Sequence, residues 1–187
     1  MVRIGDRIPD LTLQAFHQGE IKQLKLSDFK GKWLVIAFYP ADFTFVCPTE
    51  LEELADHYQE FRELGAEVVS VSTDTAYVHK AWHDTSPAIK KIRFPMAADP
   101  AGVACRAFGT YLPAEGVSLR ATFIVDPEGV LRAMEIHDNS IGRSAAEIIR
   151  KLQAAKYVSE HPGEVCPASW EPGKETLKPS LDLVGKL

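Results

Sequence analysis

The sequence predicts an α/β domain followed by an extended C-terminal arm. Short apolar runs, rich in β-branched and aromatic residues, alternate with stretches whose apolar residues recur at helical spacing. From His161 onward, proline and glycine recur too often for a long helix. We therefore predict a domain over residues 1–160 and an arm over residues 161–187. A chain of 187 residues that is 45% hydrophobic and 25% charged suits one such domain.

The centre of the predicted domain is a β-α-β unit. Residues 33–39 are an apolar run that ends at Pro40, which is typical of a strand buried on both faces. Over residues 51–64 the apolar side chains fall on one helical stripe, and Gly65 follows, as glycine often does at a helix end. Residues 66–72 form the second strand, and we expect the crossover between the strands to be right-handed.

The other elements flank this unit in chain order. They are a hairpin over residues 11–26, a helix from residues 73–75 through residue 83, a short strand over residues 95–98, a short helix that holds Cys105 and Phe108, a hairpin over residues 121–136 and a helix over residues 144–157. A β-α-β half followed by a β-β-α half is the thioredoxin architecture. The predicted fold is therefore thioredoxin-like, with an N-terminal hairpin, inserted elements and an extended C-terminal arm.

Cys47 lies where the central strand leads into the first helix, and Pro48 suits the first helical turn. Unpaired N–H groups at a helix N-terminus carry roughly half a positive charge, which favours the nucleophilic thiolate over the thiol. The alternative is a small buried apolar residue, since free cysteine is among the most buried residue types. Thr44 adds a hydroxyl that could face a group held by the sulfur, and Pro40 could shield the pocket from water.

Pro40, Thr44 and Cys47 form a Pro-x-x-x-Thr-x-x-Cys motif, which continues through Glu50. This segment resembles the peroxiredoxins, in particular the typical two-cysteine branch and its bacterial alkyl hydroperoxide reductase peroxidase subunits. The resemblance covers nearly the whole chain in order, through Trp82, Arg120, Gly142-Arg143-Ser144 and the segment 161–168 around Cys166.

The resemblance implies a thiol-dependent peroxidase that reduces hydrogen peroxide and organic hydroperoxides in antioxidant defence and redox homeostasis. Cys47 would attack the peroxide and become a sulfenic acid, with Arg120, Thr44 and Pro40 completing the site. Glu50 and Arg143 would form an ion-pair network that orients Arg120. From residue types alone, a surface salt bridge or a capping charge is the better interpretation of Glu50 and Arg143.

The resemblance also implies that Cys166 is the resolving cysteine, which forms a disulfide with Cys47 of the partner chain in a homodimer. Taken alone, Cys166 would be a spare thiol in a tail. Because a disulfide needs Cα atoms within about 7 Å, we expect the turn around Cys47 to unwind and the arm to release in each cycle.

Further implications concern assembly and partners. The family forms rings of five dimers, and residues 74–78 are a candidate for the second interface of such a decamer. A disulfide reductase, either a dedicated NADH-dependent flavoprotein or thioredoxin, would restore both thiols. No metal, haem or flavin cofactor is needed in this chain.

Two departures from the family bear on overoxidation. Eukaryotic relatives prone to overoxidation carry a Gly-Gly-Leu-Gly loop and a C-terminal helix with Tyr-Phe. Residues 87–95 lack the first, and the chain ends Val184-Gly185-Lys186-Leu187 without the second. We therefore expect the C-terminal region to release easily, so that disulfide formation outruns oxidation of Cys47 to sulfinate.

Other chemically notable residues have plainer interpretations. Cys105, among apolar neighbours, is predicted to face the core. His79 and His83 are four apart, a spacing that can bind zinc, but without a third ligand we expect ordinary helix-face histidines and no metal. Trp82 is expected to pack near the mouth of the site. The pair Phe43 and Phe45 would either be core or form dimer contacts and an apolar rim.

Composition excludes several function classes. The net charge of −5 argues against a broad nucleic-acid surface, which needs clustered Lys and Arg. We expect no signal peptide and no membrane span, and three widely spaced cysteines favour a reducing cytoplasm.

Two alternatives to the peroxidase remain: a ring-shaped holdase without essential redox chemistry, and a disulfide oxidoreductase. The second is disfavoured, because that class uses a Cys-x-x-Cys motif.

Overall fold

The computed structural model describes residues 1–186. The chain divides into two units, residues 1–145 and residues 146–187. The helix α5 (Ala145–Glu160) begins at the last residue of the first unit and opens the second. The boundary that composition predicts, between residues 160 and 161, falls at the other end of this helix.

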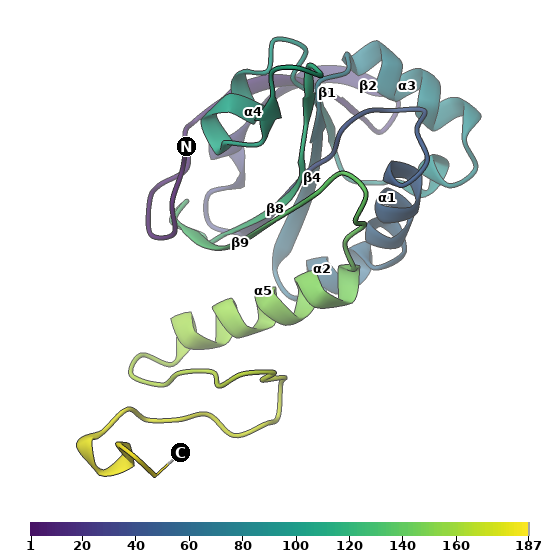
Figure 1. The fold of residues 1–187 in the computed structure, drawn as a ribbon. Coiled ribbons are helices and arrows are strands. Elements are labelled where there is room, and N and C mark those ends of the chain that lie inside the picture. The colour runs from purple at the N-terminus through teal and green to yellow at the C-terminus, as the bar shows by residue number, and fades with distance from the viewer. Residues whose placement is uncertain (187) are drawn as a thin grey trace. The chain divides into compact units, whose positions relative to one another are not determined.

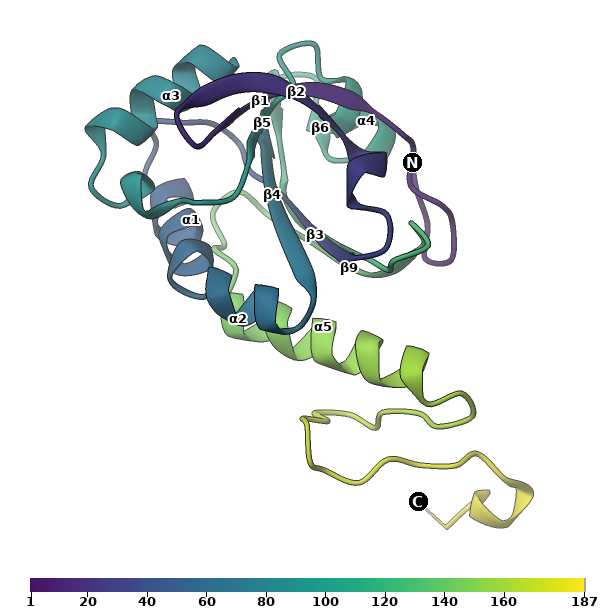
Figure 2. The same cartoon turned by 180° about the vertical axis from the view of Figure 1, so that it is seen from behind.

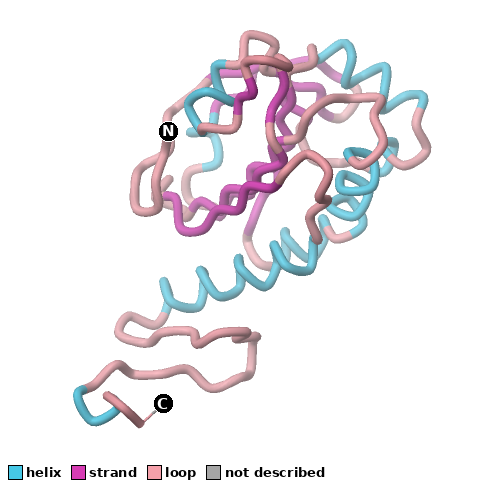
Figure 3. The backbone as a smooth tube through the Cα atoms, in the orientation of Figure 1, coloured by secondary structure: helices cyan, strands magenta, loops and turns pink. Residues whose placement is uncertain are grey.

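A seven-stranded mixed sheet forms the frame of the first unit (Figure 1; Figure 3). Its strand order is β2-β1-β5-β4-β3-β8-β9, in which β3 pairs in parallel with β4, and β4 with β5, while the other neighbours are antiparallel. The strands are β1 (Thr12–His17), β2 (Glu20–Lys25), β3 (Trp33–Phe38), β4 (Ala66–Ser72), β5 (Met96–Ala98), β8 (Arg120–Val125) and β9 (Leu131–His137). A separate two-stranded sheet joins β6 (Tyr111–Leu112) to β7 (Val117–Ser118).

The central strands confirm the prediction of a sheet buried on both faces. Every residue of β3 and of β8 is buried. On one face, Phe38 packs against Phe108 and Phe123, with ring centroids 5.2 and 5.6 Å away. Phe108 comes from α4 (Val103–Phe108), which covers that face, whereas α1 (Cys47–Asp56) and α3 (Ala76–Thr85) lie over the other (Figure 1; Figure 2). The strands that carry the site described below are therefore held in place by packing on both faces of the sheet.

The helices of the first unit differ from the prediction at one point. The single helix expected over residues 51–64 is two helices, α1 (Cys47–Asp56) and α2 (Tyr58–Glu63), separated by His57. His57 has φ −93° and ψ 2°, so its backbone leaves the helical region for one residue. The apolar stripe survives the break, because Leu51, Leu54 and Phe61 are all buried.

The remaining short elements are α3 (Ala76–Thr85) and the 3-10 turns η1 (Leu26–Phe29) and η2 (Ile89–Lys91). Thr75 caps α3, accepting a hydrogen bond from the Val78 N–H at 3.3 Å, as the predicted cap position requires. Among the residues that the structure describes, no helix combines the length and the apolar character needed to cross a membrane.

The second unit consists of α5 and the arm. After Glu160 the described arm contains one antiparallel bridge, between Val165 and Leu177, and a 3-10 turn, η3 (Leu181–Leu183). The ring of Tyr157 stacks on His161, with centroids 4.0 Å apart, and also contacts Trp170 at 4.9 Å. The lack of a long helix in residues 161–186 agrees with their proline and glycine content.

Candidate active site

Cys47 is the first residue of α1, at the end of the loop that follows β3. Pro48 occupies the first turn of the helix, where its missing N–H costs no hydrogen bond. Cys47 is completely buried, with 0% of its surface exposed. A sulfur at this position lies at the positive end of the helix dipole.

Arg120 brings a cation to this sulfur. It is the first residue of β8, which pairs with β3 in a register that sets Phe38 opposite Ala121. Its Nη1 donates a hydrogen bond to Cys47 Sγ at 3.3 Å, and its Nε donates to the Asn139 carbonyl at 3.0 Å. Burial disfavours the charge of Arg120, but its contacts with Cys47 and Glu50 outweigh this and raise its pKa. The guanidinium therefore stays charged beside the sulfur.

Glu50 holds two buried guanidinium groups together. Its Oε2 accepts from Arg120 Nη1 at 2.7 Å and from Arg143 Nη2 at 3.1 Å, and its Oε1 accepts from Arg143 Nε at 2.9 Å. All three side chains are at most 4% exposed. Burial opposes ionisation of Glu50, but the hydrogen bonds and charge of Arg143 and the charge of Arg120 lower its pKa. The carboxylate thus fixes the orientation of the arginine that contacts Cys47.

Thr44 and Pro40 lie in the same loop, both half-buried. The Thr44 hydroxyl donates to the Ala41 carbonyl at 2.8 Å, which leaves its oxygen lone pairs available as acceptors. Among the described residues, Arg120 is the side chain with a hydrogen bond to Cys47 Sγ, and neither Thr44 nor Pro40 has one. The structure therefore brings Arg120, Glu50 and Arg143 together at Cys47 and leaves the roles of Thr44 and Pro40 as predictions.

Comparison with known proteins identifies the family. Residues 4–134 match the model of the AhpC/TSA family, and residues 154–187 match the C-terminal domain of 1-Cys peroxiredoxin. Alkyl hydroperoxide reductase C of Salmonella typhimurium is 52% identical over 187 residues, with 100% of each chain covered. The chain belongs to the AhpC/TSA family.

Two solved structures place this AhpC/TSA protein among the peroxiredoxins, which are thiol-dependent peroxidases. Enterococcus faecalis AhpC matches with a TM-score of 0.86 and 48% identity, covering 89% of this chain and 100% of its own. The reduced 2-Cys peroxiredoxin of Plasmodium vivax matches with a TM-score of 0.92 and 32% identity, covering 97% and 96%. These matches confirm the predicted thioredoxin-like fold and the predicted enzyme class.

Sequence reasoning missed one buried polar cluster of this peroxiredoxin. Asp42 Oδ2 lies 2.7 Å from His79 Nδ1, and Asp42 Oδ1 accepts a hydrogen bond from the Tyr39 hydroxyl at 2.6 Å. His79 was expected to be an ordinary helix-face histidine, which is wrong, because its side chain is 0% exposed. A signal was available: Ala76, His79 and Trp82 are spaced three apart on α3, and all three are buried.

The other two cysteines have different surroundings. Cys105 is completely buried in α4, as predicted, and burial together with Asp99 raises the pKa of its thiol to about 12. Cys166 is half-buried in the arm, and its Sγ lies 3.9 Å from the Ala154 carbonyl. Burial, more than the charge of Glu164, raises the pKa of the Cys166 thiol, and Arg150 opposes this. Among the described residues, no group of three His, Cys, Asp or Glu could hold a metal ion.

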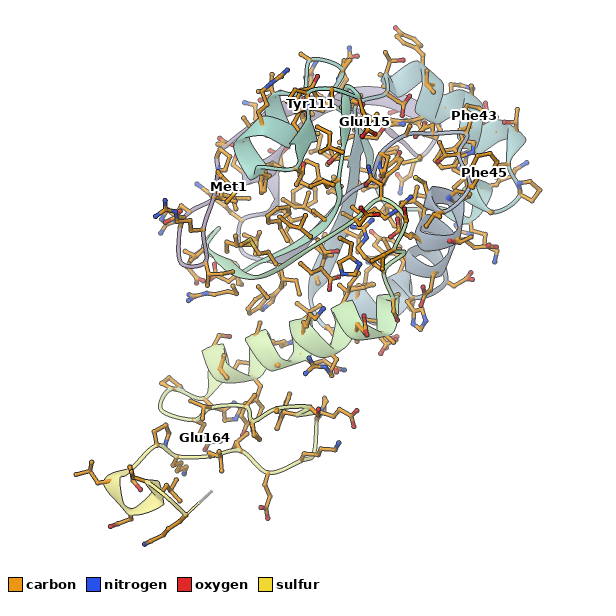
Figure 4. The ribbon with its side chains drawn as sticks, viewed as in Figure 1. Met1, Phe43, Phe45, Tyr111, Glu115 and Glu164 are labelled. Carbon is orange, nitrogen blue, oxygen red and sulfur yellow. The ribbon has the colours of Figure 1, made fainter. Side chains whose placement is uncertain are left out.

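The loop before α1 carries two exposed aromatic residues, Phe43 and Phe45 (labelled in Figure 4). Phe43 is 58% and Phe45 is 91% exposed, so the interpretation of these residues as core is wrong for both. The Phe43 ring still contacts Trp82, with centroids 5.9 Å apart, and Trp82 contacts Tyr39 at 6.3 Å. Trp82 therefore packs at this loop, as expected, and the roles of the two phenylalanines in dimer contacts or a substrate rim stay predictions.

Proposed function

We propose that this peroxiredoxin reduces hydrogen peroxide and organic hydroperoxides with Cys47 as the attacking thiolate. The observation that carries the proposal is the 3.3 Å hydrogen bond from Arg120 to Cys47 Sγ at the N-terminus of α1. The thiolate attacks the terminal peroxide oxygen, the O–O bond breaks, and the leaving oxygen takes a proton to become ROH. Cys47 becomes a sulfenic acid, while Arg120 and Thr44 stabilise the charge that moves onto the leaving oxygen, Thr44 by turning its O–H from the Ala41 carbonyl to the substrate. Pro40 shields the pocket from water.

In the second half of the cycle a disulfide forms and is then reduced. The thiol of Cys166 of a partner subunit attacks the Cys47 sulfenic acid, a disulfide forms and water leaves. Because Cys47 is completely buried, this step requires the first turn of α1 to open and the arm to release. A dithiol reductant, a dedicated NADH-dependent flavoprotein or thioredoxin, then exchanges with the disulfide and restores both thiols.

Assembly and location follow the same proposal. A homodimer is required because Cys166 acts on the partner subunit, and a decamer of five dimers would use residues 74–78 as the second interface. Tyr77 in that segment is 69% exposed, which suits a contact surface. A transient disulfide in each cycle fits a reducing compartment, so we propose the cytoplasm.

The test is electrophoresis without reductant after one equivalent of hydrogen peroxide, together with turnover assays. The wild type should give a band at dimer mass, and both Cys47→Ser and Cys166→Ser should lose it. Cys47→Ser should also abolish turnover, whereas Cys166→Ser should complete one turnover and then stop. Cys105→Ser is the matched control and should behave as the wild type. Turnover that persists in Cys47→Ser would contradict the mechanism.

A further inference from the structure

The carboxylate of Asp42 and the ring of His79 form a buried pair next to the loop that carries the active site. Both side chains are 0% exposed, and Asp42 Oδ2 lies 2.7 Å from His79 Nδ1. The other carboxylate oxygen accepts from the hydroxyl of Tyr39, which is also completely buried. Buried polar groups of this kind lower stability unless every one of them has a partner. Here each atom of the pair has one.

The hydrogen bonds determine how many protons the pair holds. His79 Nε2 lies 3.2 Å from the Ala97 carbonyl, and a carbonyl only accepts, so Nε2 carries a proton. The 2.7 Å contact between Nδ1 and Asp42 Oδ2 then needs one proton between the two atoms. Whether that proton resides on nitrogen or oxygen, the pair as a whole is neutral. Its loss would leave a buried anion close to the Asp74 carboxylate, so the pair retains it.

Asp42 is also the point at which the loop is attached to the rest of the unit. Of residues 41–46, between Pro40 and Cys47, Asp42 alone is buried. Its backbone N–H donates to Asp74 Oδ2 at 2.8 Å, and the Ser72 hydroxyl donates to the same oxygen at 2.9 Å. The next residue, Phe43, has φ 55°, a left-handed conformation that costs free energy in a bulky residue and persists only where neighbours impose it. Asp42 is therefore fixed through both its side chain and its main chain.

We propose that Asp42 and His79 are positioning residues for peroxide reduction: a buried pair that shares one proton and fixes the loop presenting Thr44 to Cys47. This inference rests on the function proposed above. The pair acts through the placement of Thr44, two residues after Asp42, and not through the ionisation of Cys47, since Arg120 contacts the sulfur independently. The charged and titratable groups around it are Tyr39, Asp74 and the two members of the pair.

The proton count makes a specific prediction about substitutions. In Asp42→Asn the amide oxygen can accept from Tyr39, and the amide nitrogen can donate to Nδ1 of a neutral His79. The hydrogen-bond pattern is then preserved without any charge. In Asp42→Ala both side-chain contacts are lost, and residue 42 keeps only its main-chain hydrogen bond to Asp74. Asparagine should therefore rescue what alanine removes.

The experiment measures, by stopped flow, the second-order rate constant of the reduced full-length protein with hydrogen peroxide. Because small misplacement of a reacting group can cost about 100-fold, Asp42→Ala should lower the rate constant about 10- to 100-fold. Asp42→Asn should stay within about threefold of the wild type, since its hydrogen bonds persist. His83→Gln is the matched control, on the same helix with its ring against Phe16, and should not change the rate. The pH dependence of Cys47 alkylation by iodoacetamide should be the same in all variants.

Two further measurements keep the test decisive. In a Thr44→Val background, Asp42→Ala should cause little additional loss, because both changes act on the same interaction. If Asp42→Ala does not fold, as judged by circular dichroism, Asp42→Ser, which is too short to reach both Tyr39 and His79, takes its place with the same expected direction.

The outcomes separate the two proposals. Equal losses in Asp42→Asn and Asp42→Ala would overturn the shared-proton pair, and an unchanged rate in Asp42→Ala would overturn the positioning role. Additive effects with Thr44→Val, or an altered pH dependence of alkylation, would overturn the route through Thr44. Failure of the proposed function would be visible in the wild type itself, as a peroxide reaction that does not consume the Cys47 thiol.

Discussion

The two cysteines assigned to the cycle differ in how they are held. Cys47, in the first unit, is completely buried and contacts an arginine whose own partner is a buried carboxylate. Cys166, in the second unit, is half-buried in an arm whose one described backbone bridge joins Val165 to Leu177. Buried charge networks are rigid because breaking one of their contacts leaves a buried charge without a partner, which costs much free energy. Exposed ion pairs, in contrast, contribute little to stability.

This difference suits the different tasks that the proposed cycle gives to the two sulfurs. An attacking thiolate benefits from groups that are already oriented when the peroxide arrives. A resolving thiol must travel to its target, and segments that move are drawn from the least stable parts of a protein. In the arm, Glu164 (labelled in Figure 4) accepts a hydrogen bond from the Tyr157 hydroxyl at 2.8 Å and lies 3.5 Å from Lys178, whose side chain is 80% exposed.

The largest effect is expected from removing the cation at Cys47. Arg120→Met should lower the second-order rate constant with hydrogen peroxide about 10²- to 10³-fold, as loss of one preorganised donor does in other enzymes. Arg132→Met is the control, because Arg132 is 48% exposed and contacts Asp126, away from Cys47. Stopped flow with the reduced protein measures both. A loss of less than tenfold in Arg120→Met would mean that the buried arginine does not act on the reaction.

The next effect concerns stability. Glu50→Gln leaves two buried guanidinium groups without their shared carboxylate, so the free energy of unfolding at pH 7 should fall by about 3–5 kcal/mol. Glu52→Gln, on the same helix, breaks an exposed pair with Lys91 and should cost at most about 1 kcal/mol. Urea denaturation of both variants against the wild type provides the measurement.

The pH dependence of that loss has a definite sign. The pKa of Glu50 is lowered in the folded protein, so its stabilising contribution is complete above the ordinary value of 4.5 and is lost as pH falls through the lower folded value. The difference in stability between the wild type and Glu50→Gln should therefore shrink as pH falls from 5 through the ordinary value of 4.5 toward the lower folded value. A constant difference across that range would show that Glu50 acts by shape and not by charge.

A smaller effect is expected in the arm. Glu164→Ala removes the acceptor for both Tyr157 and Thr176, so the amides of Val165 and Leu177, which bond to each other's carbonyls, should exchange with solvent about two- to fivefold faster. In Glu164→Ala, disulfide formation after a peroxide pulse should also be faster than in the wild type, and less Cys47 sulfinate should accumulate. Glu171→Ala is the control, since Glu171 pairs with Lys174 at the surface. Hydrogen exchange and mass spectrometry read both effects, and slower exchange in Glu164→Ala would contradict the comparison.

The contrast between the units also explains how far the sequence could be interpreted. The strand at residues 66–72 and the entry of α1 at Cys47 follow from local signals, namely an apolar run and a proline suited to the first turn. The contact of Arg120 with Cys47 requires the pairing of β3 with β8, which the family resemblance implies and residue types alone do not. The partnership of Asp42 with His79 joins a loop residue to a helix residue 37 positions away, and no local pattern encodes that distance. The arm offers only a composition signal, which predicts the lack of a long helix but not the aromatic contacts of Tyr157.

The smallest effect is expected at Cys105, and it isolates the role of charge. Cys105 and Cys47 lie in the same unit and are both 0% exposed, so burial does not distinguish them. The charge of the neighbouring group distinguishes the two cysteines. Arg120 contacts Cys47, whereas the backbone N–H of Cys105 donates to the Asp99 carboxylate at 2.8 Å.

Because the Cys105 pKa is about 12, its thiol stays protonated across the working pH range, and the thiol form is not the nucleophile. Cys105→Ala should therefore keep the peroxide rate constant within about twofold of the wild type and cost about 1 kcal/mol or less in stability. In the native wild type, iodoacetamide should label Cys47 long before Cys105, which should react only after denaturation. If the two sulfurs react at similar rates in the folded protein, then brief opening controls access to both, and the guanidinium beside Cys47 gives it no advantage.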